Sequence, residues 1–92
     1  MEKELLFISV IGQDRIGIVA RIATVLYRAG INIEDISQKI MDNYFVMVML
    51  VDIKKANCSL EKINTRLQNL ARKLNLCIQI QHENIFKMMH RI

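Results

Sequence analysis

The chain alternates between strand-like and helix-like apolar patterns, and the order of these patterns is the strongest constraint on its fold. Apolar side chains recur every three or four residues over 16–29 and again over 60–75, which predicts two amphipathic helices. Four short segments rich in apolar and β-branched residues are predicted to be strands: 5–11, 31–41, 44–53 and 76–82. The predicted order is therefore β-α-β-β-α-β.

Few backbone-breaking residues interrupt these segments, because the chain has no proline and only three glycines. We expect Gly12 to close the first strand and Gly30 to stand at the C-cap of the first helix. Asp14 is predicted to be an N-cap or near-cap of the first helix, and Ser59 the N-cap of the second.

The second and third predicted strands are joined closely. The parity of the isoleucines changes between Ile33 and Ile36, which predicts a β-bulge near Glu34-Asp35. Asp42-Asn43 then predicts a hairpin turn. The run over 44–53 is almost wholly apolar, so we expect a central strand with both faces covered.

These elements predict an α+β, ferredoxin-like βαββαβ sandwich, in which both helices cover one face of a four-stranded antiparallel sheet. The first and third strands, which are the most apolar, take its middle positions. A short C-terminal helix or ordered tail is expected to follow. We interpret residues 1–92 as a single domain, with a core over 4–82 and a C-terminal extension over 83–92.

Composition excludes several classes of protein. A hydrophobic fraction of 52% argues against intrinsic disorder, and no apolar run approaches the ~20 residues of a membrane-spanning helix. The N-terminal stretch lacks the features of a signal peptide, so we expect a cytoplasmic protein that does not bind a membrane. Cys58 and Cys77 form no CxxC motif, and we expect both to be reduced thiols.

The net charge of +4 is unevenly distributed. Residues 1–52 carry 5 basic and 7 acidic side chains, a net charge of −2, whereas residues 53–92 carry 8 basic and 2 acidic ones, a net charge of +6. Most of the excess falls on the outer face of the second helix, which indicates a solvated face. With only 5% aromatic residues, the chain is not expected to bind nucleic acid.

The loop between the first strand and the first helix carries a family resemblance. The segment GQDRIG, with Gly12, Asp14 and Gly17, resembles the G-x-D-x-P-G loop of the ACT domain, a ferredoxin-like module that senses small molecules. Ile16 stands where that pattern usually has proline. Proline would only pre-set the first helical turn, so we expect the loop conformation to persist.

The resemblance extends past the first helix, where Gly30, Asn32 and Ile33 match the G-x-N-I that opens the second strand of ACT domains. It covers about residues 4–82. Together with the C-terminal QHENIFKMMHRI, the chain is similar to small stand-alone bacterial and archaeal ACT proteins of unassigned function, and to the ACT regions of the glycine cleavage system transcriptional repressor. The resemblance implies a regulatory binding module.

The loop and the start of the second strand form the candidate ligand site. Backbone N–H groups at a helix N-terminus attract a carboxylate, whereas the Asp14 carboxylate can hold an ammonium group. Such a pair suits an amino acid or a related metabolite. In ACT dimers, the resemblance implies, the loop of one subunit faces the second strand of its neighbour, so we expect a homodimer. The candidate ligand-binding residues are Gly12, Gln13, Asp14, Arg15, Ile16, Gly17, Ile18, Asn32 and Ile33.

One other function stays open at this point. The basic second helix, with Lys62, Arg66 and Lys73, or the methionine-rich C-terminal tail could bind a regulated protein partner without any metabolite. His82 and His90 have no compact metal-binding spacing, so we expect no metal and no cofactor. No catalytic motif is found, and we do not expect an enzyme.

Overall fold

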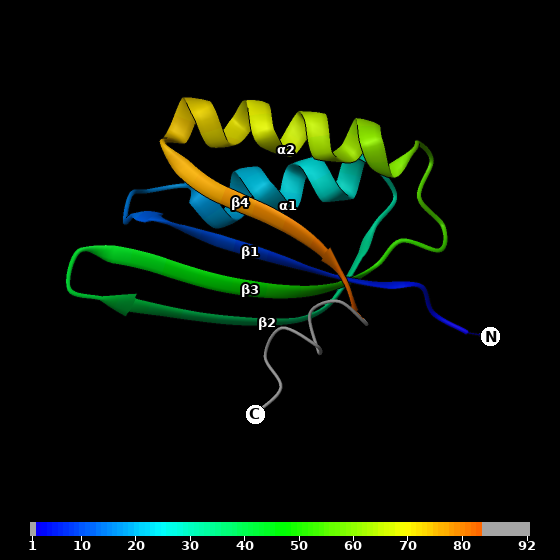
Figure 1. The fold of residues 1–92 in the computed structure, drawn as a ribbon, viewed down its shortest axis with the longest axis horizontal. Helices are drawn as coiled ribbons and strands as arrows, with labels where there is room; N and C mark the ends of the chain where they lie inside the picture. The colour runs from blue at the N-terminus through cyan, green and yellow to red at the C-terminus, as the bar shows by residue number, and fades with distance from the viewer. Residues whose placement is uncertain (1, 84–92) are drawn as a thin grey trace.

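The computed structural model describes residues 2–83, in which α1 and α2 lie beside each other on one face of a four-stranded sheet (Figure 1). The sheet order is β2-β3-β1-β4 and all neighbouring strands are antiparallel, which confirms the predicted ferredoxin-like fold and the central position of the first and third strands. The elements are β1 (Leu5–Gln13), α1 (Ile18–Arg28), β2 (Asn32–Met41), β3 (Tyr44–Asp52), α2 (Leu60–Leu74) and β4 (Leu76–His82).

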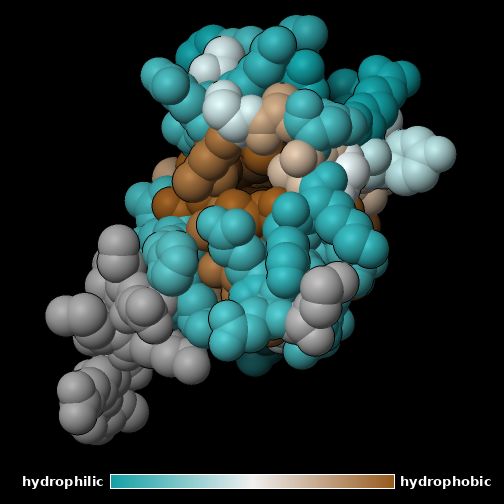
Figure 2. Space-filling view, turned by 90° about the vertical axis from the view of Figure 1, so that its right-hand side faces the viewer, coloured by the Kyte–Doolittle hydropathy of each residue, from teal (hydrophilic) through white to brown (hydrophobic). Residues whose placement is uncertain are grey.

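The core lies between the helices and the sheet. Met47 and Met49 of β3 are fully buried, and in the sheet register Ile8 of β1 lies between Met49 and Ile80 of β4. From the end of the molecule that carries the N-terminus, this core appears as an apolar band between two polar surfaces (Figure 2). The largest buried side chains are Ile8, Val10, Ile18, Ile22, Leu26, Met47, Met49, Val51, Ile63 and Leu67.

The junction between β1 and α1 differs from the prediction. β1 continues through Gly12 to Gln13, so Gly12 lies inside the strand instead of closing it. A Cβ at Gly12 would lie 2.5 Å from Cδ2 of Leu76 and 3.2 Å from the carbonyl oxygen of Asn75, so a larger residue would crowd the start of β4. The Asp14 amide then donates to the Asn43 carbonyl at 2.9 Å, which extends the strand contacts past β1.

The start of α1 also corrects the predicted cap. Asp14 is not the N-cap: that position is taken by Gly17, with φ 90°, and no side chain caps the helix among residues 2–83. The helix therefore begins at Ile18, two residues later than predicted. The physical reason is that the backbone of Asp14 is already engaged by the hairpin, four residues before the first helical turn.

Gly30 ends α1 as predicted, although the C-cap itself is Ala29 and Gly30 is the residue that follows it. Its amide donates to the Tyr27 carbonyl at 3.1 Å, and the next amide, of Ile31, donates to the Leu26 carbonyl at 3.0 Å. These two bonds form a Schellman motif, which requires a left-handed residue; Gly30 has φ 73°. The motif turns the chain sharply into β2.

The other predicted local features are confirmed. The pairing of β2 with β3 shifts register between Ile33 and Asp35, as a bulge requires. Asp42 takes a left-handed conformation, with φ 58°, in the turn between these strands. At the start of α2, the Ser59 hydroxyl accepts a hydrogen bond from the Lys62 amide at 3.2 Å. The predicted C-terminal helix or tail falls on residues 84–92, which lie outside the described part of the chain.

Within residues 2–83, no helix combines the length and the apolar character needed to cross a membrane.

Candidate functional site

The β1–α1 loop lies against the hairpin that joins β2 and β3. Gln13 pairs with Tyr44, which in turn pairs with Met41, so the end of β1 lies beside the hairpin turn. An open cavity of about 340 Å³ lies there, lined by Gln13, Asp14, Asp42 and Asn43. Asp42 and Asn43 were not predicted from the sequence as site residues. The signal that identifies them is the strand register, which needs the sheet order.

This cavity brings two carboxylates to one rim, because Asp14 comes from the loop and Asp42 from the hairpin turn. Both are exposed, so each stays solvated while it attracts a cation. α1 begins four residues after Asp14 with no acidic side chain in its first turn. Its free N–H groups carry the positive end of the helix dipole. The loop therefore offers complementary charge to an ammonium group and to a carboxylate.

Three further loop residues have distinct roles. Arg15 donates from Nη1 to the carbonyl of Leu74 at 3.3 Å, which fastens the loop to the C-terminal end of α2. Ile16 is fully exposed, which is unusual for an isoleucine. A Cβ at Gly17 would meet nothing closer than 3.9 Å, so glycine is required there for its conformation and not for space.

Asn32 and Ile33 lie at the opposite end of the sheet from the loop. Asn32 pairs with Asp52, and Asp52 pairs with Leu5, the first residue of β1. The loop follows Gln13, the last residue of β1. At ~3.3 Å per residue, a strand of this length spans about 26 Å. One chain therefore does not bring the loop and Asn32 together.

Asn32 belongs to a polar cluster at its own end of the sheet. Its side-chain amide donates to the Glu34 carboxylate, and Lys3 forms an ion pair with the same carboxylate. The hydrogen bond from Lys3 lowers the pKa of Glu34, and the same bond raises the pKa of Lys3. This cluster fixes the orientation of the Asn32 side chain, and the sequence pattern gave no sign of it.

Asp52 completes the cluster. Its Oδ1 accepts hydrogen bonds from the amides of Lys54, at 3.0 Å, and Glu4, at 3.1 Å. These two backbone donors hold the pKa of Asp52 below its ordinary value of 3.8. The carboxylate therefore ties the chain before β1 to the loop after β3.

The face of the sheet away from the helices is apolar mainly along the central strands β1 and β3, whereas the edge strands β2 and β4 add polar residues such as Ser37, Lys39 and Gln79. Its residues alternate with those of the core, and their side chains are half-buried or exposed. Met41 and Tyr44 at the hairpin are 53% and 54% exposed. The predicted covering of both faces of the third strand is thus wrong for one chain by itself: only the helix side is buried. We call the following set the apolar sheet face: Leu5, Ile11, Met41, Tyr44, Val46, Val48 and Leu50.

The structure gives less support for a functional role of the histidines and cysteines. His82 is exposed at the end of β4, and His90 lies outside the described residues. In the part of the chain from residue 2 to residue 83, no three His, Cys, Asp or Glu side chains are placed to hold a metal ion. Cys58 and Cys77 are free thiols, as expected.

Comparison with known proteins identifies the family. Residues 4–81 match the ACT domain family. A UPF0237 protein of Methanocaldococcus jannaschii is 52% identical over 85 residues, which cover 92% of this chain and 94% of that protein. The solved structure of an ACT domain protein from Streptococcus pneumoniae superposes with a TM-score of 0.78 at 31% identity and covers 94% of this chain and 97% of that one.

A second solved structure, of a proposed glycine cleavage system transcriptional repressor, superposes with a TM-score of 0.76 at 25% identity. The match covers 88% of this chain and 46% of the repressor chain, in agreement with the similarity expected from the sequence. ACT domains are typically regulatory, ligand-binding domains in amino acid metabolism, and they commonly form dimers. The chain belongs to the ACT domain family and, among its members, to the UPF0237 proteins.

Proposed function

We propose that this protein is a regulatory module that senses an amino acid, or a closely related metabolite, at the interface of a homodimer. The observation that carries the proposal is the charge arrangement of the loop. Asp14 and Asp42 line one cavity, and α1 begins nearby without a side-chain cap in the described chain. An α-amino acid presents an ammonium group and a carboxylate one carbon apart, which matches these two kinds of partner.

The separation of the two halves of the candidate site supports the proposed dimer. Asn32 lies a full strand away from the loop of its own chain. A second copy related by a twofold axis, with its sheet running the opposite way, would place the partner's Asn32 beside this loop. The same symmetry would create an identical second site. In this arrangement the binding of a ligand strengthens the interface, which is how a metabolite can change the state of a regulatory domain.

The apolar sheet face supports the same assembly. It includes Val46, Val48 and Leu50 at the centre of the sheet, together with exposed Tyr44 and Met41 at one end. Monomeric proteins rarely expose a continuous apolar surface larger than a few hundred Å². Burial of this face against a second copy would remove it from water and complete the small core.

Two measurements test the proposal. Sedimentation at micromolar concentration is expected to show a dimer, and titration calorimetry with the standard amino acids is expected to give saturable heat for at least one of them. Asp14→Ala is expected to abolish that heat. Glu61→Gln, which removes an exposed carboxylate on α2, is the matched control and is expected to bind as the unchanged protein does. A monomer, or no heat with any amino acid, would contradict the proposal.

A second function is favoured by one observation, the charge of α2. Over Leu60–Leu74 the helix carries one acidic residue, Glu61, and its exposed surface includes Lys62, Arg66 and Lys73. Such a face could bind an acidic protein partner without any metabolite. In that case, charge reversal of Lys62 and Lys73 would abolish binding to a defined partner, whereas Asp14→Ala would leave it unchanged. The methionine-rich tail named as another partner surface lies outside the described residues.

We also propose a cytoplasmic location and no catalytic reaction. Two free thiols, Cys58 and Cys77, suit a reducing compartment. The regulatory character of ACT domains supports a role in which binding alone carries the signal.

A further inference from the structure

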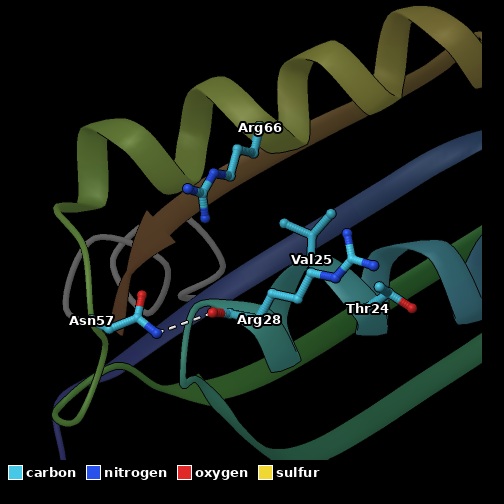
Figure 3. A pocket seen from close by; sticks show the side chains of 5 residues that line it. All are labelled: Thr24, Val25, Arg28, Asn57 and Arg66. Carbon is cyan, nitrogen blue, oxygen red and sulfur yellow. Dashed lines mark hydrogen bonds between the residues drawn. The ribbon is translucent and has the colours of Figure 1, made fainter.

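A second cavity lies on the other side of the molecule from the apolar sheet face, between α1 and α2 (Figure 3). We call it the interhelix pocket; its volume is about 480 Å³, against about 340 Å³ for the cavity at the loop. We propose that the interhelix pocket binds the oxyanion head group, a phosphate or a carboxylate, of a small metabolite. The residues that line it are Thr24, Val25, Arg28, Asn57 and Arg66.

The first argument is the pair of guanidinium groups. Arg66 extends from α2 toward α1, and Arg28 lies on the α1 wall with its guanidinium turned along the helix toward Thr24 (Figure 3). Among residues 2–83, neither side chain forms an ion pair with a carboxylate. Guanidinium groups present several N–H donors in a planar fork, which matches the oxygens of phosphate and carboxylate. Arg66 has a hydrogen bond from Nη1 to the Cys58 sulfur at 4.0 Å, and both guanidinium groups keep further N–H donors for an anion that enters the cavity.

The second argument is the charge of the whole helical layer. The segments 18–28 and 60–74 contain Glu61 as their single acidic residue. Six basic residues minus one acidic residue gives these two segments a net charge of +5. A positive field over a concave surface raises the local concentration of anions. The six basic residues are Arg21, Arg28, Lys62, Arg66, Arg72 and Lys73.

The third argument is a polar wall whose orientation is already fixed. Asn57 donates from Nδ2 to the Arg28 carbonyl at 3.0 Å, as Figure 3 shows, and its backbone amide donates to the Ala29 carbonyl at 2.9 Å. An asparagine amide has two N–H donors, so one remains for a ligand. Thr24 gives its hydroxyl hydrogen to the Ala20 carbonyl and supplies no donor to the pocket.

The apolar side of the pocket limits the ligand further. Val25 is half-buried and lines the cavity between the two arginines. A free inorganic ion would leave this surface wet, whereas a metabolite with a short apolar portion would cover it. Arg28 also has a structural role, because a positive charge in the last turn of α1 interacts favourably with the negative end of the helix dipole. Arg66 sits in the middle of α2 and has no such role, so Arg66 is the decisive residue for the test.

The test is a titration followed by NMR at constant ionic strength, with phosphate, acetate and chloride as separate probes. We expect saturable shifts of the Asn57 side-chain amide and of the Arg28 and Arg66 Nε–H groups with phosphate or acetate, and none with chloride. The stronger of the two probes identifies the head group. Arg66→Gln is expected to weaken binding at least tenfold. Arg72→Gln removes the same charge from the same helix outside the pocket and is expected to have little effect.

Shifts that do not saturate, shifts of equal size with chloride, or equal losses in Arg66→Gln and Arg72→Gln would overturn the proposal. Arg66 is exposed, so its replacement is expected to keep the fold, and a thermal melt checks this. Arg28→Lys is the second variant, because it keeps charge at the end of α1 and removes the fork. Asp14→Ala is expected to leave phosphate binding unchanged, so a failure at the loop is distinguishable from a failure at this pocket.

Discussion

The backbone amide of Asp14 donates a hydrogen bond to the carbonyl oxygen of Asn43 at 2.9 Å. This bond joins the loop after β1 to the turn between β2 and β3. It places the side chains of Asp14 and Asp42 on one cavity, although they are distant in sequence. The same bond explains why Asp14 does not cap α1. The loop is therefore built as the continuation of a strand, and its function depends on the hairpin as much as on its own residues.

Gly17 offers a direct test of this loop conformation. Gly17→Ala is expected to destabilise the fold by about 1–2 kcal/mol, because an L-residue pays that amount in the left-handed region. Its φ is 90°, and a Cβ there meets no atom closer than 3.9 Å, so no steric clash contributes. Gly17→Asn is expected to cost less, since asparagine tolerates this region better. Denaturant unfolding measures both, and equal costs for the two variants would contradict the conformational explanation.

A substitution at Asp42 tests the charge of the proposed amino-acid site without changing the backbone conformation of the turn. Asp42 has φ 58° in the hairpin turn, and asparagine also adopts this conformation readily. Asp42→Asn is therefore expected to keep the thermal stability of the fold while it weakens amino-acid binding about tenfold, as the loss of one charge-assisted contact of ~1.4 kcal/mol would do. Calorimetry measures the affinity. Glu61→Gln, on α2 away from the cavity and from the apolar sheet face, is the control, and a similar loss there would argue for a non-specific charge effect.

Much of the fold follows from local sequence signals. The Schellman motif at Gly30, the cap at Ser59 and the bulge before Asp35 each depend on a few neighbouring residues, and all were predicted. The element order predicted the ferredoxin-like sheet, and the two most apolar strands take its middle positions, as that topology requires. The prediction that Asp14 caps α1 was wrong. Aspartate is suited to capping, but the Asp14 amide instead donates to the carbonyl of Asn43, which is distant in sequence.

The candidate site depends more on tertiary contacts and was predicted less completely. Asp42 joins the loop cavity only through the register of β1 and β3. Glu34 holds the Asn32 side chain, and Lys3 reaches Glu34 from far along the chain. The Asn57–Arg28 contact of the interhelix pocket also joins separate elements. Such contacts cannot be predicted from periodicity or motifs, since each partner by itself resembles an ordinary surface residue.

The polar cluster around Asn32 predicts how stability changes with pH. The pKa values of Glu34 and Asp52 are lowered in the folded state, so their contribution is present above the ordinary values of 4.5 and 3.8 and is lost as the pH falls through the folded values. The pKa of Lys3 is raised, so its contribution is present below 10.5 and is lost as the pH rises through the folded value.

Thermal melts across the pH range are expected to show these two losses, and both should weaken in high salt because Lys3 is exposed and the two carboxylates are only partly buried. Asp52→Asn is expected to reduce mainly the acid loss, since it removes the titrating carboxylate while the amide oxygen can still accept from the Lys54 and Glu4 amides. Lys3→Met is expected to reduce both losses because it removes the ion pair with Glu34. If the loss of stability at low pH is unchanged in Asp52→Asn, other carboxyl groups account for that loss.

Val48 provides the sharpest test of the proposed dimer. It lies on central β3, on the side of the sheet away from the helices, and its side chain is half-buried. Val48→Lys places a charge in the middle of the apolar sheet face. If a second copy covers this face, the unpaired charge is desolvated in the dimer and remains solvated in the monomer. Sedimentation is therefore expected to show a shift from dimer to monomer.

Tyr27 supplies the matched control, because it is 82% exposed on α1, in the opposite layer of the molecule. Tyr27→Lys adds the same charge and is expected to leave the dimer intact. If Val48→Lys is folded and still dimeric, the interface lies elsewhere, and the exposed edge strand β2 becomes the surface to test next. Amino-acid binding distinguishes the two cases further: a dimer-dependent site is expected to lose its ligand in Val48→Lys, although every residue of the loop is unchanged.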